Sequence, residues 1–462
     1  MTVLLDAGSQ DATVPVTPLC ASRLAGWLES QPDGVRRWVA ALGFAAQPAT
    51  WCALPGADGA IARVLAGVPE GPDLYALAHL PYALPPGAYR LEAEPAPAGA
   101  PPPYASAALG FALGAYAFTR YRKPKRAPAK LVLPDGVDRG AIELLASAVA
   151  RVRDLVNTPT EHMGPEDLEA ATQQLGAEHG ARVRAVVGEA LLAQNFPAIH
   201  AVGRASHRAP RLIELEWGDP AHPRLSIVGK GVCFDTGGLD LKPADGMRWM
   251  KKDMGCAAHA IALAGLVMAA KLPVHLQLLV PAVENAIGPE AFRPGEVIAT
   301  RAGLSVEIDN TDAEGRVVLG DALAYAGESN PVLILDFATL TGAARIALGP
   351  ELPALFSNRD EEAVKFAAAS RAVQDPVWHM PLWKPYGSML DSIIADFANA
   401  GPSRMAGSIT AALYLDRFVK PAIPWLHLDT FAWNEIDRPG RPRGGEAQGL
   451  RAAFAFLRER FA

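Results

Sequence analysis

The stretch Asp309-Asn310-Thr311-Asp312-Ala313-Glu314-Gly315-Arg316 decides how this chain is organised. It places two carboxylates and a guanidinium, those of Asp312, Glu314 and Arg316, directly before an apolar segment of helical periodicity. A buried carboxylate is costly unless a cation compensates its charge. The stretch can be a polar turn that caps the helix, or an extended segment in which alternate side chains point the same way. In the extended case acid, acid and base would face one cavity.

Length, composition and charge indicate an ordinary globular protein. The 462 residues allow for two or three domains, and 43 basic against 49 acidic residues give a net charge of −6. This charge does not favour a general nucleic-acid-binding role. Four cysteines without a Cys-x-x-Cys pair argue against a disulfide framework or a thiolate zinc site. No secretory signal or convincing membrane span is visible, so we expect a cytoplasmic protein without a membrane partner.

Periodicity and prolines divide the chain into two parts. Residues 1–137 are expected to form a smaller N-terminal α/β domain, which includes a proline-dense connection at 94–103. Residues 138–156 carry apolar side chains on one stripe and predict an amphipathic connecting helix. Residues 157–462 are then expected to form a larger C-terminal domain.

Strands and helices alternate in the C-terminal part. Apolar runs at 225–228, 274–280 and 332–335 are typical of buried strands, and 257–271 is typical of a buried helix. The alternation predicts an α/β fold whose largely parallel or mixed sheet is flanked by helices. Ligands bind such sheets beyond the carboxyl ends of the strands. The Gly-rich and polar segments at 229–238 and 336–342 are therefore expected to meet 309–316 at one edge.

Several common catalytic motifs are absent from the sequence. Gly229-Lys230-Gly231 lacks the spacing of a phosphate-binding Walker motif. Neither a His-Glu-x-x-His zinc motif nor a Gly-x-Ser-x-Gly nucleophile elbow occurs. His259 is interpreted as a core histidine, and His427 and Asp429 as buried residues that support the site rather than bind a metal.

A set of carboxylates and basic residues remains to be explained. It consists of Lys230, Asp235, Lys242, Asp253, Asp312, Glu314 and Arg316. Each has an ordinary explanation; Asp253, for example, can cap the apolar helix that follows it. Several carboxylates at one strand edge nevertheless need cations, and two lysines would not suffice. Oxygen ligands suit Mn²⁺, Mg²⁺ or Zn²⁺, and carboxylates that bridge two ions are typical of hydrolases.

The segment Asn310–Arg316 resembles the signature of the leucyl aminopeptidase family of dinuclear metallopeptidases. Other segments resemble the same family and stand in its order. They are Asn157-Thr158-Pro159, Val228–Gly238, Met250–Gly255, Pro281–Asn285 and Ala338–Ala343. The resemblance runs from about residue 140 to the C-terminus and, more weakly, through the N-terminal part. It implies a cytoplasmic aminopeptidase that acts on peptides and assembles as a homohexamer.

The resemblance also implies roles for individual residues. Two divalent ions per subunit, Mn²⁺ or Zn²⁺, would be held by Lys230, Asp235, Asp253, Asp312 and Glu314. A lysine ligand is neutral, so Lys230 would need a strongly lowered pKa. Lys242 would stabilise the oxyanion of the reaction. Arg316 would hold a bicarbonate ion that acts as base toward a metal-bridging water or hydroxide.

The same resemblance places the first substrate side chain in an apolar pocket. Met250, Thr339, Leu340 and Gly342 would line it and favour Leu- or Met-like N-terminal residues. Two departures from the family pattern stand beside this pocket. Cys256 replaces a glycine at the start of the helix, and the segment Thr430–Trp433 is bulkier than expected.

Two other functions compete with the aminopeptidase hypothesis. A DNA-binding regulator on the same scaffold is one alternative, since some relatives have that role, but the acidic net charge disfavours nucleic acid as a partner. A catalytically inactive structural relative is the other, and the complete set of seven site residues argues against it.

Overall fold

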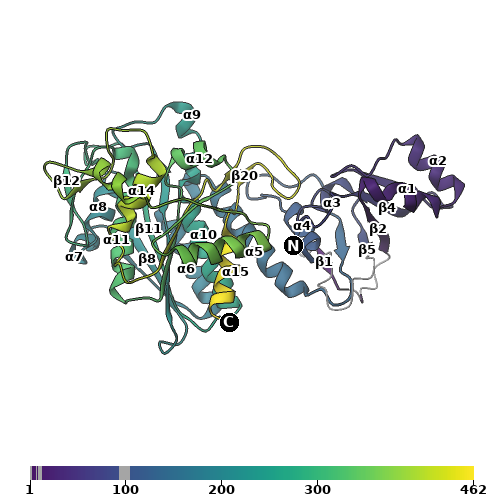
Figure 1. Cartoon of the computed structure of the whole chain (residues 1–462), viewed down its shortest axis with the longest axis horizontal. Coiled ribbons are helices and arrows are strands. Elements are labelled where there is room, and N and C mark those ends of the chain that lie inside the picture. The colour runs from purple at the N-terminus through teal and green to yellow at the C-terminus, as the bar shows by residue number, and fades with distance from the viewer. Residues whose placement is uncertain (1–2, 7, 9–12, 93–104) are drawn as a thin grey trace. The chain divides into compact units, whose positions relative to one another are not determined.

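A computed structural model describes residues 3–6, 8, 13–92 and 105–462. The chain divides into two compact units (Figure 1). One unit is Met1–Ala150 with Glu435–Arg443, and the other, here called the catalytic unit, is Arg151–Asn434 with Gly444–Ala462. The proline-dense connection lies outside the described residues. The boundaries 1–137, 138–156 and 157–462 stay a proposal, and the sequence showed no sign that 435–443 belongs with the first unit.

The N-terminal unit is built on a six-stranded sheet with the order β1-β6-β5-β2-β4-β3. The strands are β1 Leu4–Leu5, β2 Thr13–Leu19, β3 Trp51–Pro55, β4 Ile61–Gly67, β5 Ala88–Leu91 and β6 Lys130–Val132. The helices are α1 Ala21–Glu29, α2 Asp33–Ala41, α3 Leu80–Ala83 and α4 Ala105–Gly114. All strand pairs are parallel except β3 with β4. Leu19, Val39, Leu54 and Leu65 form a core on which α1 and α2 pack.

The catalytic unit contains a nine-stranded mixed sheet. Eight strands run in the order β16-β15-β18-β14-β9-β11-β8-β7, and β10 pairs with the far part of β11. They are β7 Arg182–Val187, β8 Arg211–Trp217, β9 Arg224–Gly229, β10 Gly231–Asp235, β11 His275–Asn285, β14 Leu333–Ala338, β15 Ala354–Ser357, β16 Trp378–His379 and β18 Trp425–Asp429. The central strands β18, β14, β9 and β11 are parallel. They are buried on both faces, which explains their continuous apolar runs.

Helices cover both faces of this sheet (Figure 1). One layer contains α6 Pro165–His179, α10 Gly255–Ala269 and α15 Leu450–Arg460, beside the C-terminal part of α5 Arg139–Asn157. The other contains α8 Pro197–Gly203, α11 Glu314–Glu328 and α14 Gly407–Asp416. At Gly229 a Cβ atom would lie 2.6 Å from Ala260 Cβ, so β9 and α10 pack closer than a side chain would allow. The predicted α/β architecture is confirmed.

Shorter elements complete the catalytic unit. Its remaining helices are α7 Ala190–Ala193, α9 Ala244–Met247, α12 Gly342–Leu348 and α13 Asp360–Ala372. The strands β12 Val297–Ala299, β13 Ser305–Glu307 and β17 Phe397–Ala398 form a small sheet, and β19 Trp433–Asn434 pairs with β20 Gly444–Gly445. Among the described residues, Met250–Ala269 is the helical stretch long and apolar enough to cross a membrane, but 89% of its apolar window is buried inside the protein. It is therefore a core helix.

Candidate active site

The stretch Asp309–Arg316 forms a capped turn and not an extended strand. Thr311–Ala313 is a 3-10 helix, and α11 begins at Glu314. The Asn310 side chain accepts a hydrogen bond from the Asp312 amide at 2.8 Å, as expected of a capping residue. Asn399 holds the turn from outside, because its Oδ1 accepts from the amides of Asp309 and Asn310. The capping interpretation is confirmed, and the strand-like alternation of the three charged side chains is wrong.

Three carboxylates of the predicted set converge at the edge of the sheet. Asp235 ends β10, while Asp312 and Glu314 lie on the turn and the first residue of α11. One oxygen from each lies within 4.8 Å of the others, close enough to surround a metal ion. Asn285, at the end of β11, orients Asp235 by donating to its Oδ1 at 2.8 Å. Asn285 lies in the segment Pro281–Asn285 that resembles the family, but no role could be predicted for it from the sequence.

Two lysines lie among these carboxylates. Lys230 Nζ is 2.7 Å from Asp253 Oδ2 and 2.9 Å from Glu314 Oε1, and it donates to the Thr339 carbonyl at 2.9 Å. Lys242 Nζ lies 2.9 Å from Asp235 Oδ2 and also pairs with Asp312. All five expected ligands and the expected electrophilic lysine therefore occupy one charged cluster.

The electrostatics of the cluster reflect its crowded negative charge. Burial, and then the charge of Asp235, raise the pKa of Glu314 to about 8 and that of Asp312 to about 6. Burial alone would lower the pKa of Lys230, but Asp253 and Glu314 outweigh it and raise that pKa above its ordinary value. This direction is opposite to the one that the lysine-ligand expectation required. The neighbouring carboxylates explain the difference, because they stabilise the charged amine.

Arg316 is buried and held by the backbone of Asn399. Its Nη1 donates to the Asn399 carbonyl at 2.6 Å, and its Nε is buried without an acceptor among the residues that the structure describes. A buried donor without a partner is rare and indicates room for an additional acceptor. Asn399 thus supports both the turn and Arg316. No motif in the sequence pointed to it, since it lies more than eighty residues further along the chain.

A cavity of about 320 Å³ opens beside the cluster. Four proposed metal ligands and Lys242 line it, as do all four expected pocket residues, Met250, Thr339, Leu340 and Gly342. Glu314 and Arg316 lie behind this surface and are not among the lining residues. Thr339 also donates through its hydroxyl to the Asp253 carbonyl at 2.9 Å, which joins the loop after β14 to the 3-10 helix Met250–Met254. Asp429 holds the same loop through the Leu340 amide and Thr341, as its expected supporting role requires.

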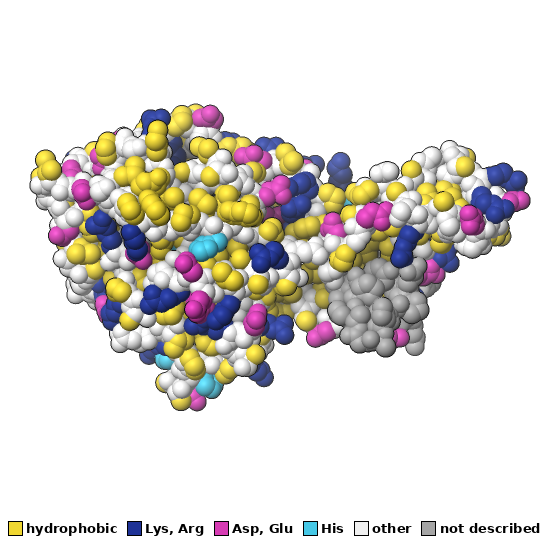
Figure 2. All heavy atoms as spheres, in the orientation of Figure 1, with side chains coloured by type: hydrophobic (Ala, Val, Ile, Leu, Met, Phe, Trp, Pro, Cys, Tyr) yellow, Lys and Arg dark blue, Asp and Glu magenta, His cyan; other side chains and the backbone are white. Residues whose placement is uncertain are grey.

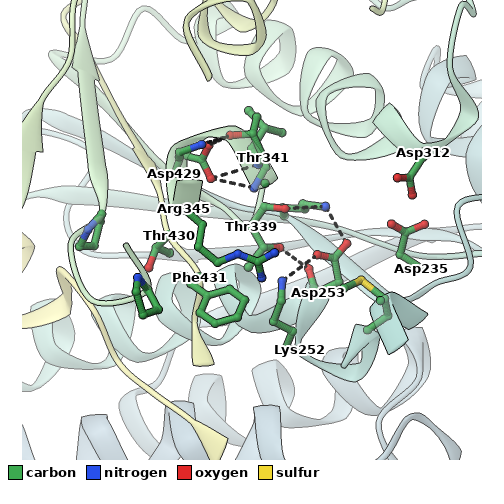
Figure 3. A pocket seen from close by; sticks show the side chains of 18 of the residues that line it. Asp235, Lys252, Asp253, Asp312, Thr339, Thr341, Arg345, Asp429, Thr430 and Phe431 are labelled. Carbon is green, nitrogen blue, oxygen red and sulfur yellow. Dashed lines mark hydrogen bonds and ion pairs between the residues drawn. The ribbon is translucent and has the colours of Figure 1, made fainter. Parts of the chain in front are cut away.

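One end of the cavity carries two cations around an aromatic ring (Figure 3). The Arg345 guanidinium lies over the Phe431 ring with Cζ 4.6 Å from the centroid. Lys252 Nζ lies 5.1 Å from the same centroid and 3.6 Å from Asp253 Oδ1. Burial lowers the pKa of Lys252, and the charges of Lys230 and Arg345 act in the same direction against the effect of Asp253. The bulk of the segment Thr430–Trp433 could be predicted from the sequence, but the two cations beside Phe431 could not.

The remaining side chains that were singled out are part of the core. Cys256 is fully buried, and burial raises the pKa of its thiol well above the ordinary value, which disfavours a reactive thiolate. His259 contacts the Gly255 carbonyl and accepts from the Gln448 amide, so it is a satisfied core residue. His427 pairs with Asp336 at 2.6 Å and is fully buried.

Family models match both parts of the chain. The model described as "Cytosol aminopeptidase family, catalytic domain" matches residues 150–454. The model described as "M17 aminopeptidase, N-terminal domain" matches residues 14–134. The chain belongs to the cytosol aminopeptidase family. The resemblance read from the motifs is confirmed, and with it the expectation of a leucyl aminopeptidase-type hydrolase.

Individual relatives agree with this membership. A probable cytosol aminopeptidase of Syntrophotalea carbinolica is 42% identical over 79% of this chain and 77% of its own length. The crystal structure of cytosol aminopeptidase from Coxiella burnetii is 48% identical, covers 100% of both chains and superposes with a TM-score of 0.96. The bottromycin maturation enzyme BotP, solved in complex with Mn, is 32% identical over 98% of this chain and 100% of its own, with a TM-score of 0.88. None of these three is named as a DNA-binding protein, so that alternative gains no support.

Proposed function

We propose that the catalytic unit removes N-terminal residues from peptides with two divalent ions, Mn²⁺ or Zn²⁺, bound at the carboxylate cluster. The observation that carries this proposal is the convergence of Asp235, Asp312 and Glu314 within 4.8 Å. Lys230 and Asp253 complete the proposed ligand set. That BotP was solved with Mn supports the choice of ion.

The chemistry of the donor set fits bound cations. Asp253 Oδ2, Asp312 Oδ1 and Glu314 Oε1 are buried and make no hydrogen bond with the described residues, although each lies within ion-pair distance of a lysine amine. Burial, and then repulsion from Asp235, raise the pKa values of Asp312 and Glu314. Divalent ions would relieve that repulsion. Their binding would also favour the neutral amine of Lys230, which must lose its proton to act as a ligand.

The residues around the ions have distinct proposed roles. When bound, the ions would polarise the scissile carbonyl and lower the pKa of a water molecule. Lys242 would then stabilise the negative charge that develops on the carbonyl oxygen. Arg316 would hold a bicarbonate ion through its free Nε, and that anion would accept the proton of the attacking water. The substrate α-amine would lie against Asp253, which explains why only a chain end is cleaved.

The cavity supports a preference for apolar first residues. Met250 and Leu340 offer apolar surface, while Thr339 and Gly342 leave space beside them. Burial of a Leu or Met side chain against such a wall contributes about 1.5–3 kcal/mol. We propose Leu- and Met-like residues as the main substrates on this basis.

We also propose a cytoplasmic homohexamer. Figure 2 shows hydrophobic side chains gathered on one face of the catalytic unit. Ile346, Ile393 and Met405 of this unit are 87%, 101% and 79% exposed. Large exposed apolar side chains are typical of surfaces that another subunit covers.

Metal analysis coupled to peptidase assays tests the proposed function. Elemental analysis is expected to find two divalent ions per chain, and a chelator should abolish hydrolysis of leucyl p-nitroanilide. Asp312→Ala and Glu314→Ala should abolish it as well while circular dichroism stays that of the wild type. Full activity in either folded variant would show that the site is assigned to the wrong residues, and a chelator without effect would refute the metal.

A further inference from the structure

Arg345 is the cation without an anionic partner among the described residues that line the cavity. Among the described residues it makes neither a side-chain hydrogen bond nor an ion pair, and its one specific contact is the Phe431 ring. A ring face attracts a cation but accepts no in-plane hydrogen bond. Arg345 lines the cavity and is exposed, so its N–H donors remain available to solvent or to a ligand.

The carboxylates that line the cavity are already engaged. Asp235 and Asp312 pair with Lys242, and Asp253 pairs with Lys230. Asp429 uses both oxygens on backbone and hydroxyl donors of the loop after β14, at 2.6 to 3.2 Å. No carboxylate of this cavity is thus free to neutralise Arg345, which is exposed to solvent and can exchange its water for a carboxylate of a ligand.

Phe431 and α12 hold the guanidinium in position. Arg345 lies in α12, which begins at the expected pocket residue Gly342 and follows the loop of Thr339 and Leu340. In Figure 3 its side chain crosses the Phe431 ring and points toward the end of the cavity where Lys252 lies. A second positive charge at that end adds to the attraction for an anion. Arginine presents a planar fork that matches a carboxylate with two parallel hydrogen bonds.

We propose that Arg345 is a specificity-determining residue that binds a carboxylate of the peptide substrate. This inference rests on the proposed aminopeptidase function and extends its substrate range beyond Leu and Met. A peptide can supply the carboxylate from an N-terminal glutamate side chain, whose methylene stem fits the apolar wall, or from the C-terminus of a dipeptide. Both sources offer the same two oxygens to the guanidinium.

Two substrate pairs distinguish the sources. Glutamyl and glutaminyl p-nitroanilide differ only in the side-chain charge, and leucylglycine and leucylglycinamide differ only in the terminal charge. Within each pair, kcat/KM for the compound with the carboxylate is divided by kcat/KM for the compound with the amide. This ratio is measured for the wild type and for Arg345→Met, which keeps the bulk over Phe431 and removes the charge. We expect one of the two ratios to fall about tenfold or more, because a charge-assisted bidentate contact is lost.

Arg371→Met is the matched control, since Arg371 is an exposed arginine near the end of α13 and outside the cavity. It should leave both ratios unchanged. If the wild type is active and neither ratio falls in Arg345→Met, the inference is overturned while the aminopeptidase function stands. If the wild type hydrolyses none of the four compounds, the proposed function fails. Calorimetric titration of the same compounds then decides the inference by the ratio of dissociation constants.

Discussion

Replacement of Gly315 by alanine should inactivate the enzyme without unfolding it. A Cβ atom at Gly315 would lie 2.4 Å from Lys230 Cε and 2.6 Å from its Nζ. Ordinary contacts between carbon atoms are about 3.5–4.0 Å, so the Lys230 side chain would have to move by roughly 1 Å. That amine is held at 2.7 Å from Asp253 and 2.9 Å from Glu314, and a shift of this size disrupts both contacts.

The substitution should lower activity strongly but change stability little. A displacement of about 1 Å in a catalytic constellation can cost roughly a hundredfold in rate. Gly315 is the second residue of α11, where alanine is favoured over glycine by less than the roughly 1 kcal/mol of a helix interior, and this preference offsets part of the strain. We expect kcat/KM for leucyl p-nitroanilide to fall about a hundredfold, metal content to decrease, and the melting temperature to change little.

Gly327→Ala is the matched control in the same helix. A Cβ atom there would meet Ile423 Cδ1 at 3.7 Å and Lys420 Cγ at 3.9 Å, which are ordinary contacts. This variant should keep wild-type activity and gain up to about 1 kcal/mol of stability. Wild-type kcat/KM and metal content in Gly315→Ala would show that the Lys230 side chain has room to move. That result would refute the argument that a Cβ atom at position 315 displaces Lys230 from its contacts.

Two further predictions concern buried ion pairs of the catalytic unit. Glu446→Gln should lower the free energy of unfolding in urea by about 3 kcal/mol, because Arg153 and Glu446 pair at 3.0 Å in the interior. Glu178→Gln, which removes a partly exposed pair with Arg151 in the same unit, should cost less than about 1 kcal/mol, and equal losses in the two variants would contradict this account. His427→Gln tests a pH dependence: burial lowers the pKa of His427, but Asp336 outweighs it and leaves that pKa raised. The pair therefore contributes full stability below the unfolded-state pKa of about 6.5 and loses it as the pH rises through the folded-state pKa. The stability difference between wild type and His427→Gln should be largest near pH 5–6 and shrink at alkaline pH; a difference that grows with pH would contradict the pairing.

The layout of the catalytic unit could be predicted from local sequence. The apolar run at 225–228 lies within β9, and the run at 332–335 overlaps the start of β14. The helix expected at 257–271 is α10, within a few residues at either end. Such runs allow the elements to be predicted because the elements are buried on both faces. Their sequences are therefore apolar throughout, without a polar side. Since parallel strands end at one edge, the loops that follow them were expected to meet there, and they do.

The conformation of the opening stretch could not be predicted in the same way. Asp312, Glu314 and Arg316 have the spacing of a strand face, yet they lie on a 3-10 turn and the first turn of a helix. Asn399 decides this, because it pairs with the backbone of Asp309 and Asn310 from a distant part of the chain. Contacts of such long sequence separation leave no periodic trace.

The sequence by itself determined which residues form the charged cluster, because carboxylates and lysines follow buried parallel strands, whose ends meet at one edge of the sheet. Tertiary structure alone decided their electrostatics. The pKa of Lys230 depends on Asp253 and Glu314, which come to it from separate elements. Likewise, Arg345 looks like one surface arginine among many in the sequence, and only the fold places it over Phe431 without an anionic partner. The protonation state and the hydrogen-bond partners of a side chain depend on its neighbours in space. The linear sequence shows which groups are present but not which of them lie side by side.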